Sequence, residues 1–378
     1  MDTSTEQLLS LIAENAERDF GSALSLPPAI YHSQEILDLE KQRIFARGWV
    51  CAGRLAEIAT PGEYIALDIL DQAVFVIRQK DGSVKAFPNV CLHRCATLLK
   101  GRGKVRRVSC PYHSWTYELD GRLVGAPYMQ RTDGFEKSGF SLEPLACETW
   151  QGFIYVNLDR NASSLVDKLA PLNEFVDDYQ MADYVHVHEE HEVWNTNWKC
   201  LVENFMDVYH LHRVHAESFN KYLQNEETTY MFPGNDAFCW QYVQEDGSEH
   251  SVHAHPDNTR LKGEMRHRTT LFNVFPAHVA QLQPDLLWYL SIMPEGLDKV
   301  RIRWAVSMPQ DYLDSAEDRA AHIKAEIDFL RLVNSEDQPT VESVFRATAS
   351  ADAMRGPLSW LERNCFDFGR YLARQLCD

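Results

Sequence analysis

Two short stretches of the chain combine cysteine and histidine at spacings suited to holding metal. The first reads Cys91-Leu-His93, and the second, sixteen residues later, reads Cys110-Pro-Tyr-His113. Each offers one thiolate and one imidazole, so a tight loop can aim both at one centre. A zinc site usually has the form Cys-x(2–4)-Cys with a later histidine pair. The pairing of every cysteine with a histidine instead favours a [2Fe–2S] cluster in which two cysteines hold one iron and two histidines the other.

A second set of candidate ligands follows a predicted helix that Asn197 can cap. Asp207 and His210 are three residues apart, so on a continuing helix they share a face and can touch. His215 comes five residues later, about 140° further around a straight helix, and reaches the same point only where the helix ends or loosens. Taken alone, a His-x4-His pair is typical of a polar helix end. Two histidines and a carboxylate around one metal, with open positions, describe the site of non-haem Fe(II) oxygenases.

The composition favours an intracellular enzyme over a nucleic-acid or membrane protein. The 378 residues suffice for two domains, and the shares of 45% hydrophobic and 24% charged residues are ordinary. A net charge of −18 provides no basic footprint for nucleic acid, and no apolar run approaches the roughly 20 residues of a membrane span. The acidic N-terminus lacks a signal-peptide pattern, so the expected localisation is cytoplasmic. Nine scattered cysteines do not resemble a secreted disulfide framework.

Hydrophobic patterning divides the chain into three expected segments. Residues 1–39 form an N-terminal helical segment, with a helical apolar pattern over 4–20. Residues 40–158 contain short strands and Asp-Gly turns, and are expected to form an all-β domain that carries both Cys/His loops and closes with a strand over 150–158. Residues 159–378 form the second domain.

The second domain is expected to mix strands and helices. Two antiparallel strands are predicted over 286–293 and 300–308. Ser315 is expected to cap a long amphipathic helix, and Pro339 to occupy the first turn of the next helix, with Asp337 at its N-terminus. Aromatic residues in this half are candidates to line a pocket: Phe238, Trp240, Tyr242, Phe272, Phe275, Trp288 and Tyr289.

Both motifs occur in the order, spacing and chain length of the Rieske non-haem iron ring-hydroxylating oxygenases, and the chain resembles their catalytic α subunit from about residue 35 to the end. The resemblance implies an α+β chain, with an N-terminal all-β Rieske [2Fe–2S] domain. A C-terminal helix-grip catalytic domain, an antiparallel sheet wrapped around long helices, would follow. Cys91 and Cys110 would hold one cluster iron, and His93 and His113 the other.

The resemblance also implies ligands in the second domain. His210 and His215 would bind the mononuclear Fe(II). The third ligand in the family is a carboxylate in an Asp-x4-Glu context near the C-terminus, and Asp337 matches that pattern. Glu336 is the runner-up for this position, and His212 fits the family register less well than His210.

Asn204 and Asp207 complete the expected site as catalytic residues. Asp207 matches the residue that, in the family, bridges the two metal centres across a subunit boundary. It would contact His210 of its own chain and His113 of the neighbouring subunit, as a ligand histidine needs an acceptor for its free N–H. This implies a head-to-tail ring, typically a homotrimer, with cross-subunit electron transfer.

Two positions depart from the family pattern. The family usually has glycine after His-Arg in the first loop and after His in the second, whereas this chain has Cys95 and Ser114. Both changes restrict the backbone beside the cluster.

The implied activity is activation of O2 at the mononuclear Fe(II) and mono- or dioxygenation of a small organic substrate. Nothing in the chain resembles a Gly-rich dinucleotide site, so electrons from NADH or NADPH would come from a separate reductase, with or without a ferredoxin. An aromatic acid is the expected substrate, because aromatic hydroxylation is the commonest activity of the family. The alternative is hydroxylation or demethylation of a quaternary ammonium compound such as choline, a betaine or carnitine. More distant alternatives are an electron-transfer protein and a zinc-stabilised module without catalysis.

Overall fold

The computed structural model of the chain describes residues 4–219, 228–245, 252–315 and 318–377. Two compact units emerge: one is Phe45–Asp167, and the other joins the residues up to Ile44 with those from Lys168 onward. Within the described ranges, no helix combines the length and apolar character that crossing a membrane requires.

The unit Phe45–Asp167 is built from small antiparallel sheets, as the sequence predicted. Its strand orders are β1-β10-β9, β4-β3-β2-β5 and β6-β7-β8. The strands are β1 Val50–Arg54, β2 Glu63–Ile69, β3 Gln72–Arg78, β4 Val84–Pro88, β5 Arg102–Lys104, β6 Val108–Ser109, β7 Thr116–Tyr117, β8 Leu123–Gly125, β9 Ala146–Trp150 and β10 Phe153–Asn157. The two Cys/His loops lie between β4 and β5 and between β6 and β7.

The end of this unit differs from the prediction of one closing strand over 150–158. A hairpin occupies this part of the chain, with β9 paired antiparallel to β10. Gln151 and Gly152 form its two-residue turn with φ of +50° and +80°. Two consecutive left-handed residues are what a tight hairpin turn with the right twist requires, and the sequence pattern did not reveal that Gln151 takes that conformation.

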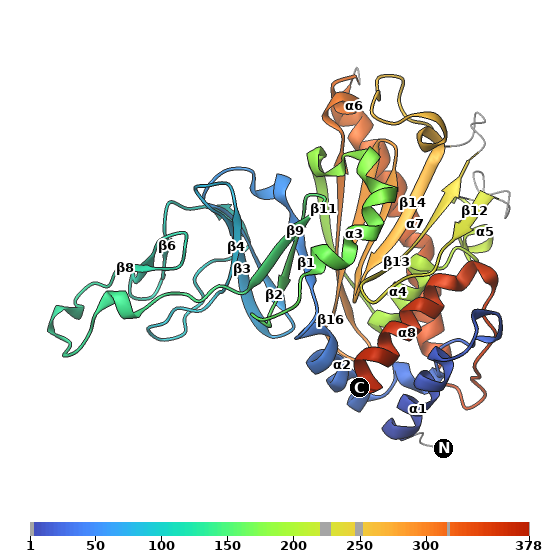
Figure 1. Cartoon of the computed structure of the whole chain (residues 1–378), viewed down its shortest axis with the longest axis horizontal. Helices are drawn as coiled ribbons and strands as arrows, with labels where there is room; N and C mark the ends of the chain where they lie inside the picture. Colours follow the sequence, from blue (N-terminus) through green and yellow to red (C-terminus); the bar gives the residue numbers. More distant parts are fainter. Residues whose placement is uncertain (1–3, 220–227, 246–251, 316–317, 378) are drawn as a thin grey trace. The chain divides into compact units, whose positions relative to one another are not determined.

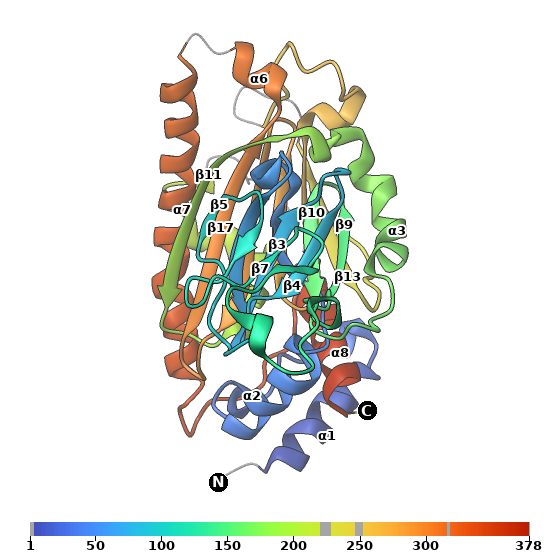
Figure 2. The ribbon, with the colours of Figure 1, turned by 90° about the vertical axis from the view of Figure 1, so that its left-hand side faces the viewer.

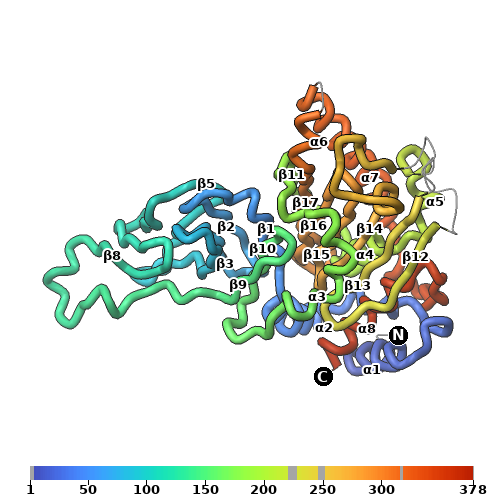
Figure 3. The backbone as a smooth tube through the Cα atoms, turned by 45° about the horizontal axis from the view of Figure 1, so that its top comes forward, coloured from blue at the N-terminus to red at the C-terminus, as the bar shows by residue number. Residues whose placement is uncertain are grey.

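The second unit is dominated by one seven-stranded antiparallel sheet in the order β11-β17-β16-β15-β14-β13-β12 (Figures 1 and 3). The predicted pair of antiparallel strands is present as β16 and β17, which pair from Leu287 with Ser307 to Pro294 with Val300. The strands are β11 Val185–Trp194, β12 Thr229–Met231, β13 Phe238–Gln244, β14 Arg268–Val274, β15 His278–Gln283, β16 Leu286–Pro294 and β17 Val300–Met308.

Helices accompany this sheet, with α7 running beside β11 and β17 (Figure 2) and α1 packed along α8 (Figure 1). The predicted α+β class, an all-β module and a catalytic unit with a large antiparallel sheet and long helices, is confirmed. The helices are α1 Thr5–Ala16, α2 Gln34–Glu40, α3 Leu165–Val176, α4 Trp198–Met206, α5 Leu211–Val214, α6 Gln310–Ser315, α7 Arg319–Ala347 and α8 Arg363–Cys377.

The long helix α7 corrects two predictions. Its N-cap is Asp318, whose side chain accepts from the Ala321 N–H, whereas Ser315 ends the preceding helix α6. The helix does not stop before Pro339 but passes through it, so Asp337 lies in mid-helix rather than at an N-terminus. A proline in a helix interior loses one backbone hydrogen bond, and the buried face that α7 presents on both sides of Pro339 offsets this loss.

Helix α4 begins at the predicted cap, where the Asn197 side chain accepts from the Lys199 N–H, but it ends earlier than the sequence suggested. Asp207 has an extended backbone, with φ −87° and ψ 115°, and terminates the helix. Asp207 and His210 therefore do not share a helix face. His210 and His215 flank the short helix α5, and His215 leaves the helix with φ −90° and ψ 51°, so the two histidines are not held at the positions of one continuous helix.

A buried ion pair anchors α4 to the N-terminal segment of the same unit. Lys199 Nζ lies 2.7 Å from Glu40 Oε1, and both side chains are fully buried. Trp198 Nε1 donates to the other oxygen of Glu40 at 2.7 Å. Both carboxylate oxygens thus have donors, which is the condition under which burying a charge is tolerated.

Replacing Lys199 with methionine should destabilise the protein by about 3–5 kcal/mol, because the Glu40 carboxylate would stay buried without its counter-charge. Urea unfolding followed by circular dichroism would measure the change. Lys80→Met is the control, since the Lys80 side chain is 77% exposed and its loss should change stability by less than about 0.5 kcal/mol. Equal, small effects of the two variants would contradict the anchoring role of Lys199.

Candidate metal centres and substrate cavity

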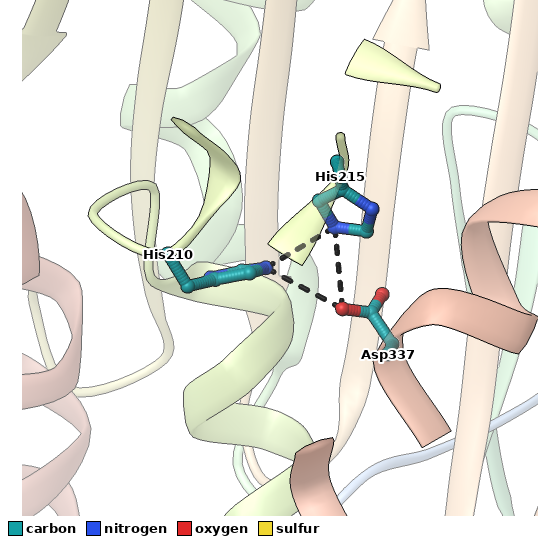
Figure 4. Close-up of side chains that lie close together, drawn as sticks. All are labelled: His210, His215 and Asp337. Atoms are coloured by element: carbon teal, nitrogen blue, oxygen red, sulfur yellow. Dashed lines mark hydrogen bonds and ion pairs between the residues drawn. The ribbon is translucent and has the colours of Figure 1, made fainter. Parts of the chain in front are cut away.

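Three predicted ligands from two distant parts of the chain converge on one point. His210 Nε2 and His215 Nε2 lie 3.3 Å apart, and Asp337 Oδ1 lies 3.4 Å from the first and 3.2 Å from the second. Figure 4 shows the two imidazoles and the carboxylate facing one another. His210 precedes α5, His215 follows it, and Asp337 comes from the middle of α7.

The triangle formed by these three donor atoms is better explained by a bound metal ion than by hydrogen bonds among the three side chains. Ligands held about 2.0–2.2 Å from a divalent metal lie about 2.8–3.6 Å from one another in octahedral or tetrahedral arrangements, a range that includes all three sides. Asp337 Oδ1 is buried and has no hydrogen-bond partner among the described residues. An orphaned buried carboxylate oxygen beside two imidazole nitrogens is an unfavourable arrangement that a bound cation would relieve. Two imidazoles and one carboxylate are the donor set of a facial-triad iron site.

The charges of the triad depend on one another. Burial lowers the pKa of His210, but the Asp207 and Asp337 carboxylates outweigh it and raise the pKa to about 9. Burial raises the pKa of Asp337, but the two histidines outweigh it and lower the pKa to about 2. Without metal, a proton on His210 therefore compensates the buried carboxylate at neutral pH.

Glu336, the runner-up ligand, has a different place in the structure. Its Oε2 lies 3.0 Å from His215 Nδ1, on the side of the ring opposite the triad. The same carboxylate accepts from the Glu217 N–H and the Ser218 hydroxyl. A carboxylate on Nδ1 orients the ring and leaves Nε2 free to bind metal. His212, the rejected alternative, is exposed, with Nδ1 2.7 Å from the Tyr209 carbonyl oxygen.

Asp207 lies beside the Nδ1 atom of His210, as Glu336 lies beside that of His215. Its Oδ2 is 3.4 Å from His210 Nδ1, within ion-pair range although outside hydrogen-bond geometry. Its Oδ1 accepts from the Tyr209 N–H at 2.6 Å. Asn204 lies one turn earlier on α4 and lines the cavity beside the triad. Glu203 is half-buried, and loss of solvent raises its pKa to about 7 although the Tyr31 hydroxyl donates to it.

The two Cys/His loops share one backbone design. The carbonyl of Cys91 accepts from the Cys95 N–H and that of Cys110 from the Ser114 N–H, both at 3.0 Å. Cys95 and Ser114 both have φ of +57°. They occupy the positions where the family usually has glycine, and a side chain in this left-handed region costs about 1 kcal/mol. The loops therefore keep the glycine conformation without glycine.

The donors of these loops are spread more widely than one zinc ion would require. Among the residues that the structure describes, no three of Cys91, His93, Cys110 and His113 bring donor atoms within 4.8 Å of one another. Ligands of a single zinc lie about 3.3–3.8 Å apart. The His93 and His113 rings lie 4.7 Å apart between centroids. A four-donor set of this width fits a two-iron cluster better than a zinc ion.

Both ligand sulfurs predicted for these loops have hydrogen-bonding neighbours, and at Cys110 these favour the thiolate. Burial raises the pKa of Cys110, but the N–H groups of Tyr112 and His113 and the Cys91 thiol outweigh it, so the net shift is downward. The Tyr117 hydroxyl lies 3.5 Å from Cys91 Sγ and accepts from the Leu92 N–H. Hydrogen bonds to cluster sulfurs stabilise the added negative charge of the reduced state.

A cavity of about 410 Å³ opens beside the triad, a size typical of small-molecule sites. Its aromatic residues are Phe205, Phe219, Trp288, Tyr312 and Phe329. Three carboxylates line it in addition to Asp337, namely Glu245, Asp285 and Glu326. None of the described residues that line this cavity is lysine or arginine.

The sequence predicted the three residues that converge in the triad, but it did not predict which residues line the cavity. Of the seven aromatic residues it proposed for a pocket, Trp288 is the one that lines this cavity within the described part of the chain. Trp240 and Tyr242 instead pack in a separate ring cluster with Phe232. Glu326 lies eleven residues before Asp337, three turns along the same helix face, and this spacing is the sequence signal that points to it.

Comparison with known proteins yields two family matches. The family described as the ring hydroxylating alpha subunit (catalytic domain) matches residues 181–377, and the Rieske [2Fe–2S] domain matches residues 48–138. The carnitine monooxygenase oxygenase subunit of Acinetobacter baumannii is 33% identical over 264 residues, which are 67% of this chain and 69% of that protein.

Solved structures share the fold over nearly the whole chain. A quaternary ammonium Rieske monooxygenase, whose structure was reported in connection with carnitine oxidation and inter-subunit electron transfer, aligns with a TM-score of 0.79 at 25% identity. The alignment covers 97% of this chain and 96% of that one. Naphthalene 1,2-dioxygenase from Rhodococcus sp., bound to indole, has a TM-score of 0.81 and covers 99% of both chains. At 21% identity it shows likeness of fold alone.

Asp337→Ala should lose the mononuclear metal and keep the visible absorbance of the cluster, because only the triad loses a donor. Glu336→Gln should keep the metal but weaken its binding about 10–100-fold, since it perturbs only the orientation of His215. Metal analysis and a chelator competition on anaerobically purified protein would measure both. The assignment of ligand and supporting residue would be reversed if Glu336→Gln emptied the site and Asp337→Ala did not.

Metal affinity should rise with pH up to about pH 9, because a bound metal must displace the proton that His210 carries in the metal-free protein. Below that pKa the apparent affinity should increase by up to about tenfold per pH unit and then level off. The same proton stabilises the metal-free fold, fully below about pH 6.5 and no longer above the raised pKa. Chelator competition with Fe²⁺ at several pH values would test this, and a flat profile between pH 7 and 9 would contradict it.

Proposed function

The chain belongs to the ring-hydroxylating oxygenase α subunits, in which a Rieske [2Fe–2S] domain precedes the catalytic domain, and we propose that this member oxygenates an organic cation of the quaternary ammonium class. It is the oxygenase component of a Rieske non-haem iron oxygenase, a family whose cofactors are the Rieske cluster and a mononuclear iron. Its similarity to a carnitine monooxygenase subunit supports the substrate class.

The observation that carries the proposal is the chemistry of the cavity wall. Carboxylates and aromatic rings face this cavity, and no lysine or arginine is among its described lining residues. Aromatic faces attract a quaternary ammonium group by about 0.5–2 kcal/mol per ring. Carboxylates add a long-range attraction for any cation that enters.

The residues that line the cavity also disfavour binding of an aromatic acid, which was the substrate expected from the sequence. A substrate carboxylate in this cavity would meet Glu245, Asp285 and Glu326, with no lysine or arginine among the described lining residues to pair with it. An unpaired buried carboxylate costs several kcal/mol. Amide side chains at Gln281 and Gln283 could donate hydrogen bonds, but they do not offset the charge of the neighbouring acids. The quaternary ammonium alternative is therefore the better supported of the two.

The protein's own contribution to the reaction is to position ligands and substrate and to exclude water. When bound, the mononuclear iron activates dioxygen with electrons that arrive through the cluster. Glu336 and Asp207 would hold the rings of His215 and His210 so that both Nε2 atoms face the metal position. Phe205, Trp288 and Phe219 would keep the substrate beside that position and keep bulk water away.

We also infer a separate reductase and an electron path between subunits. An oxygenase subunit needs an external electron source, and a relative of known structure is associated with inter-subunit electron transfer. Residues 82–117, which contain both cluster loops, hold seven lysines and arginines and no acid, while the whole chain has a net charge of −18. This charge contrast favours docking of one copy's cluster loops on an acidic surface of another, as in a head-to-tail homotrimer.

A substrate screen tests the proposed class. Holoenzyme with an NADH-dependent reductase would be offered choline, longer trimethylammonium compounds, carnitine and glycine betaine, alongside benzoate and an aminobenzenesulfonate. Oxygen uptake and product analysis should show coupled turnover with members of the cationic group. Coupled turnover of an aromatic acid, with none for any quaternary ammonium compound, would overturn the proposal.

Asp207→Asn should leave both metal centres loaded while turnover falls by at least about 100-fold, because the amide cannot act as the charged link between His210 and the neighbouring cluster. Metal content, the cluster spectrum and coupled oxygen uptake are the measurements. Turnover close to that of the unmodified enzyme would contradict the bridging role.

Co-expression with a second inactive variant separates the path between subunits from one within the chain. Cys110→Ser removes a cluster ligand but keeps Asp207. Mixed oligomers would pair the cluster of an Asp207→Asn subunit with the intact relay of a Cys110→Ser subunit, so activity should return. No recovery in oligomers shown to be mixed would favour transfer within one chain.

A further inference from the structure

The cavity has two chemically different ends, and we propose that the end remote from the metal triad is a subsite for the positive group of the substrate, with Glu326 as its counter-ion. This inference rests on the proposed function and makes it more specific. It locates the cation away from the metal and so assigns the oxidised carbon to the opposite end of the molecule.

Helix α7 sets the distance between the two ends. Glu326, Phe329, Val333 and Asp337 all line the cavity, and their spacing of three, four and four residues places them on one helix face. Glu326 and Asp337 are eleven residues apart, or about 16 Å along the axis at ~1.5 Å per residue. One stripe of α7 therefore carries a metal ligand at one end and an unused carboxylate at the other, with apolar side chains between them.

Glu326 differs from the other two acids because it is not already engaged. Asp285 accepts from the His255 N–H and the Asn258 side-chain amide. Glu245 accepts from the Val252 N–H. Among the contacts of the described residues, the Glu326 carboxylate has no hydrogen-bond donor, and burial raises its pKa although His322 works in the opposite direction. Glu326 is among the residues that line the cavity.

Aromatic groups surround this carboxylate. Tyr312, from α6, is close enough for Glu326 to raise the pKa of its hydroxyl, after burial as the larger cause. The Tyr312 ring packs edge-on against His322, with centroids 4.8 Å apart, which holds the ring in place. Phe329 follows Glu326 on the same stripe. A carboxylate flanked by aromatic faces suits an alkylammonium ion, because the rings contact its methyl groups while the acid balances its charge.

This arrangement constrains the shape of the substrate. After allowance for both side chains and the metal–ligand distance, a molecule that uses both ends needs roughly 8–12 Å between its charged nitrogen and the oxidised carbon. A compact zwitterion cannot span that length, and a carboxylate reaching toward Glu326 would be repelled. We therefore expect an extended cation without an anionic group, oxygenated far from its nitrogen.

A series of ω-hydroxyalkyl-trimethylammonium ions, from choline upward, tests the length. Binding to anaerobic holoenzyme, measured by calorimetry, should strengthen with chain length and be tightest near about six to ten methylenes, at ~1.25 Å for each. Mass spectrometry of the turnover product should locate the new oxygen at the end remote from nitrogen. Tightest binding of choline, or oxidation of an N-methyl group, would overturn the inference.

Neutral analogues separate charge from shape. In each analogue a tert-butyl group replaces trimethylammonium, which keeps the volume and removes the charge. The unmodified enzyme should bind the cation more tightly than its analogue, and Glu326→Gln should lower affinity for the cation about 10–100-fold with little effect on the analogue. Asp328→Asn is the control, since it removes a charge from an exposed side chain of α7 that is paired with Lys324 and Arg331, and it should change neither affinity.

The outcomes distinguish failure of the inference from failure of the proposed function. No preference for the cation in the unmodified enzyme would reject the quaternary ammonium class and the subsite with it. A preference that survives in Glu326→Gln would keep the class and reject Glu326 as counter-ion. If the Glu326→Gln variant folds poorly, Glu326→Asp replaces it in the test. This variant keeps the carboxylate charge but moves it away from the cavity by one methylene. In Glu326→Asp the preference for the cation over its neutral analogue should persist, and the alkyl chain that binds most tightly should be longer. An unchanged optimal chain length would contradict the subsite.

Discussion

The convergence of His210, His215 and Asp337 is the constraint on which the rest of this structure depends. The three donor atoms lie within 3.4 Å of one another although more than 120 residues separate His215 from Asp337 in the chain. Such a group of buried polar atoms is stable only with a compensating cation, either a proton on His210 or a metal. His210 and His215 flank the short helix α5, and the unbroken helix α7 presents Asp337 to them.

Three acids support the triad and the helix beside it, and each has a distinct task. Glu336 orients His215, Asp207 lies against His210, and the buried Glu40 holds α4 through Lys199. In a chain with a net charge of −18, these acids would repel one another unless every one had a donor or a cation. Glu326 stands apart because it lines the cavity without a donor among the described residues, which is why a charged substrate is the natural partner for it.

The two cluster loops keep a left-handed backbone conformation at positions where the family usually has glycine. Cys95 and Ser114 adopt the left-handed backbone that glycine enters without strain, each stabilised by its hydrogen bond to a ligand cysteine's carbonyl. The cost of about 1 kcal/mol per position is small against a loop fixed by β-strands on both sides and, in the holoenzyme, by metal bonds. The backbone conformation of the two loops therefore does not depend on glycine.

The sequence by itself determined the family and the two-part architecture, and it predicted the three residues that converge in the triad. It could do so because metal chemistry limits which side chains can act and at what spacing. It could not show that Asp207 ends a helix, that Pro339 lies inside one, or that 150–158 belongs to a hairpin. Those outcomes depend on burial against elements far away in the chain. The lining of the cavity was decided by tertiary structure alone, since Glu326, Tyr312 and Asp285 meet there from three separate segments, and local sequence carries no information about which distant side chains share a space.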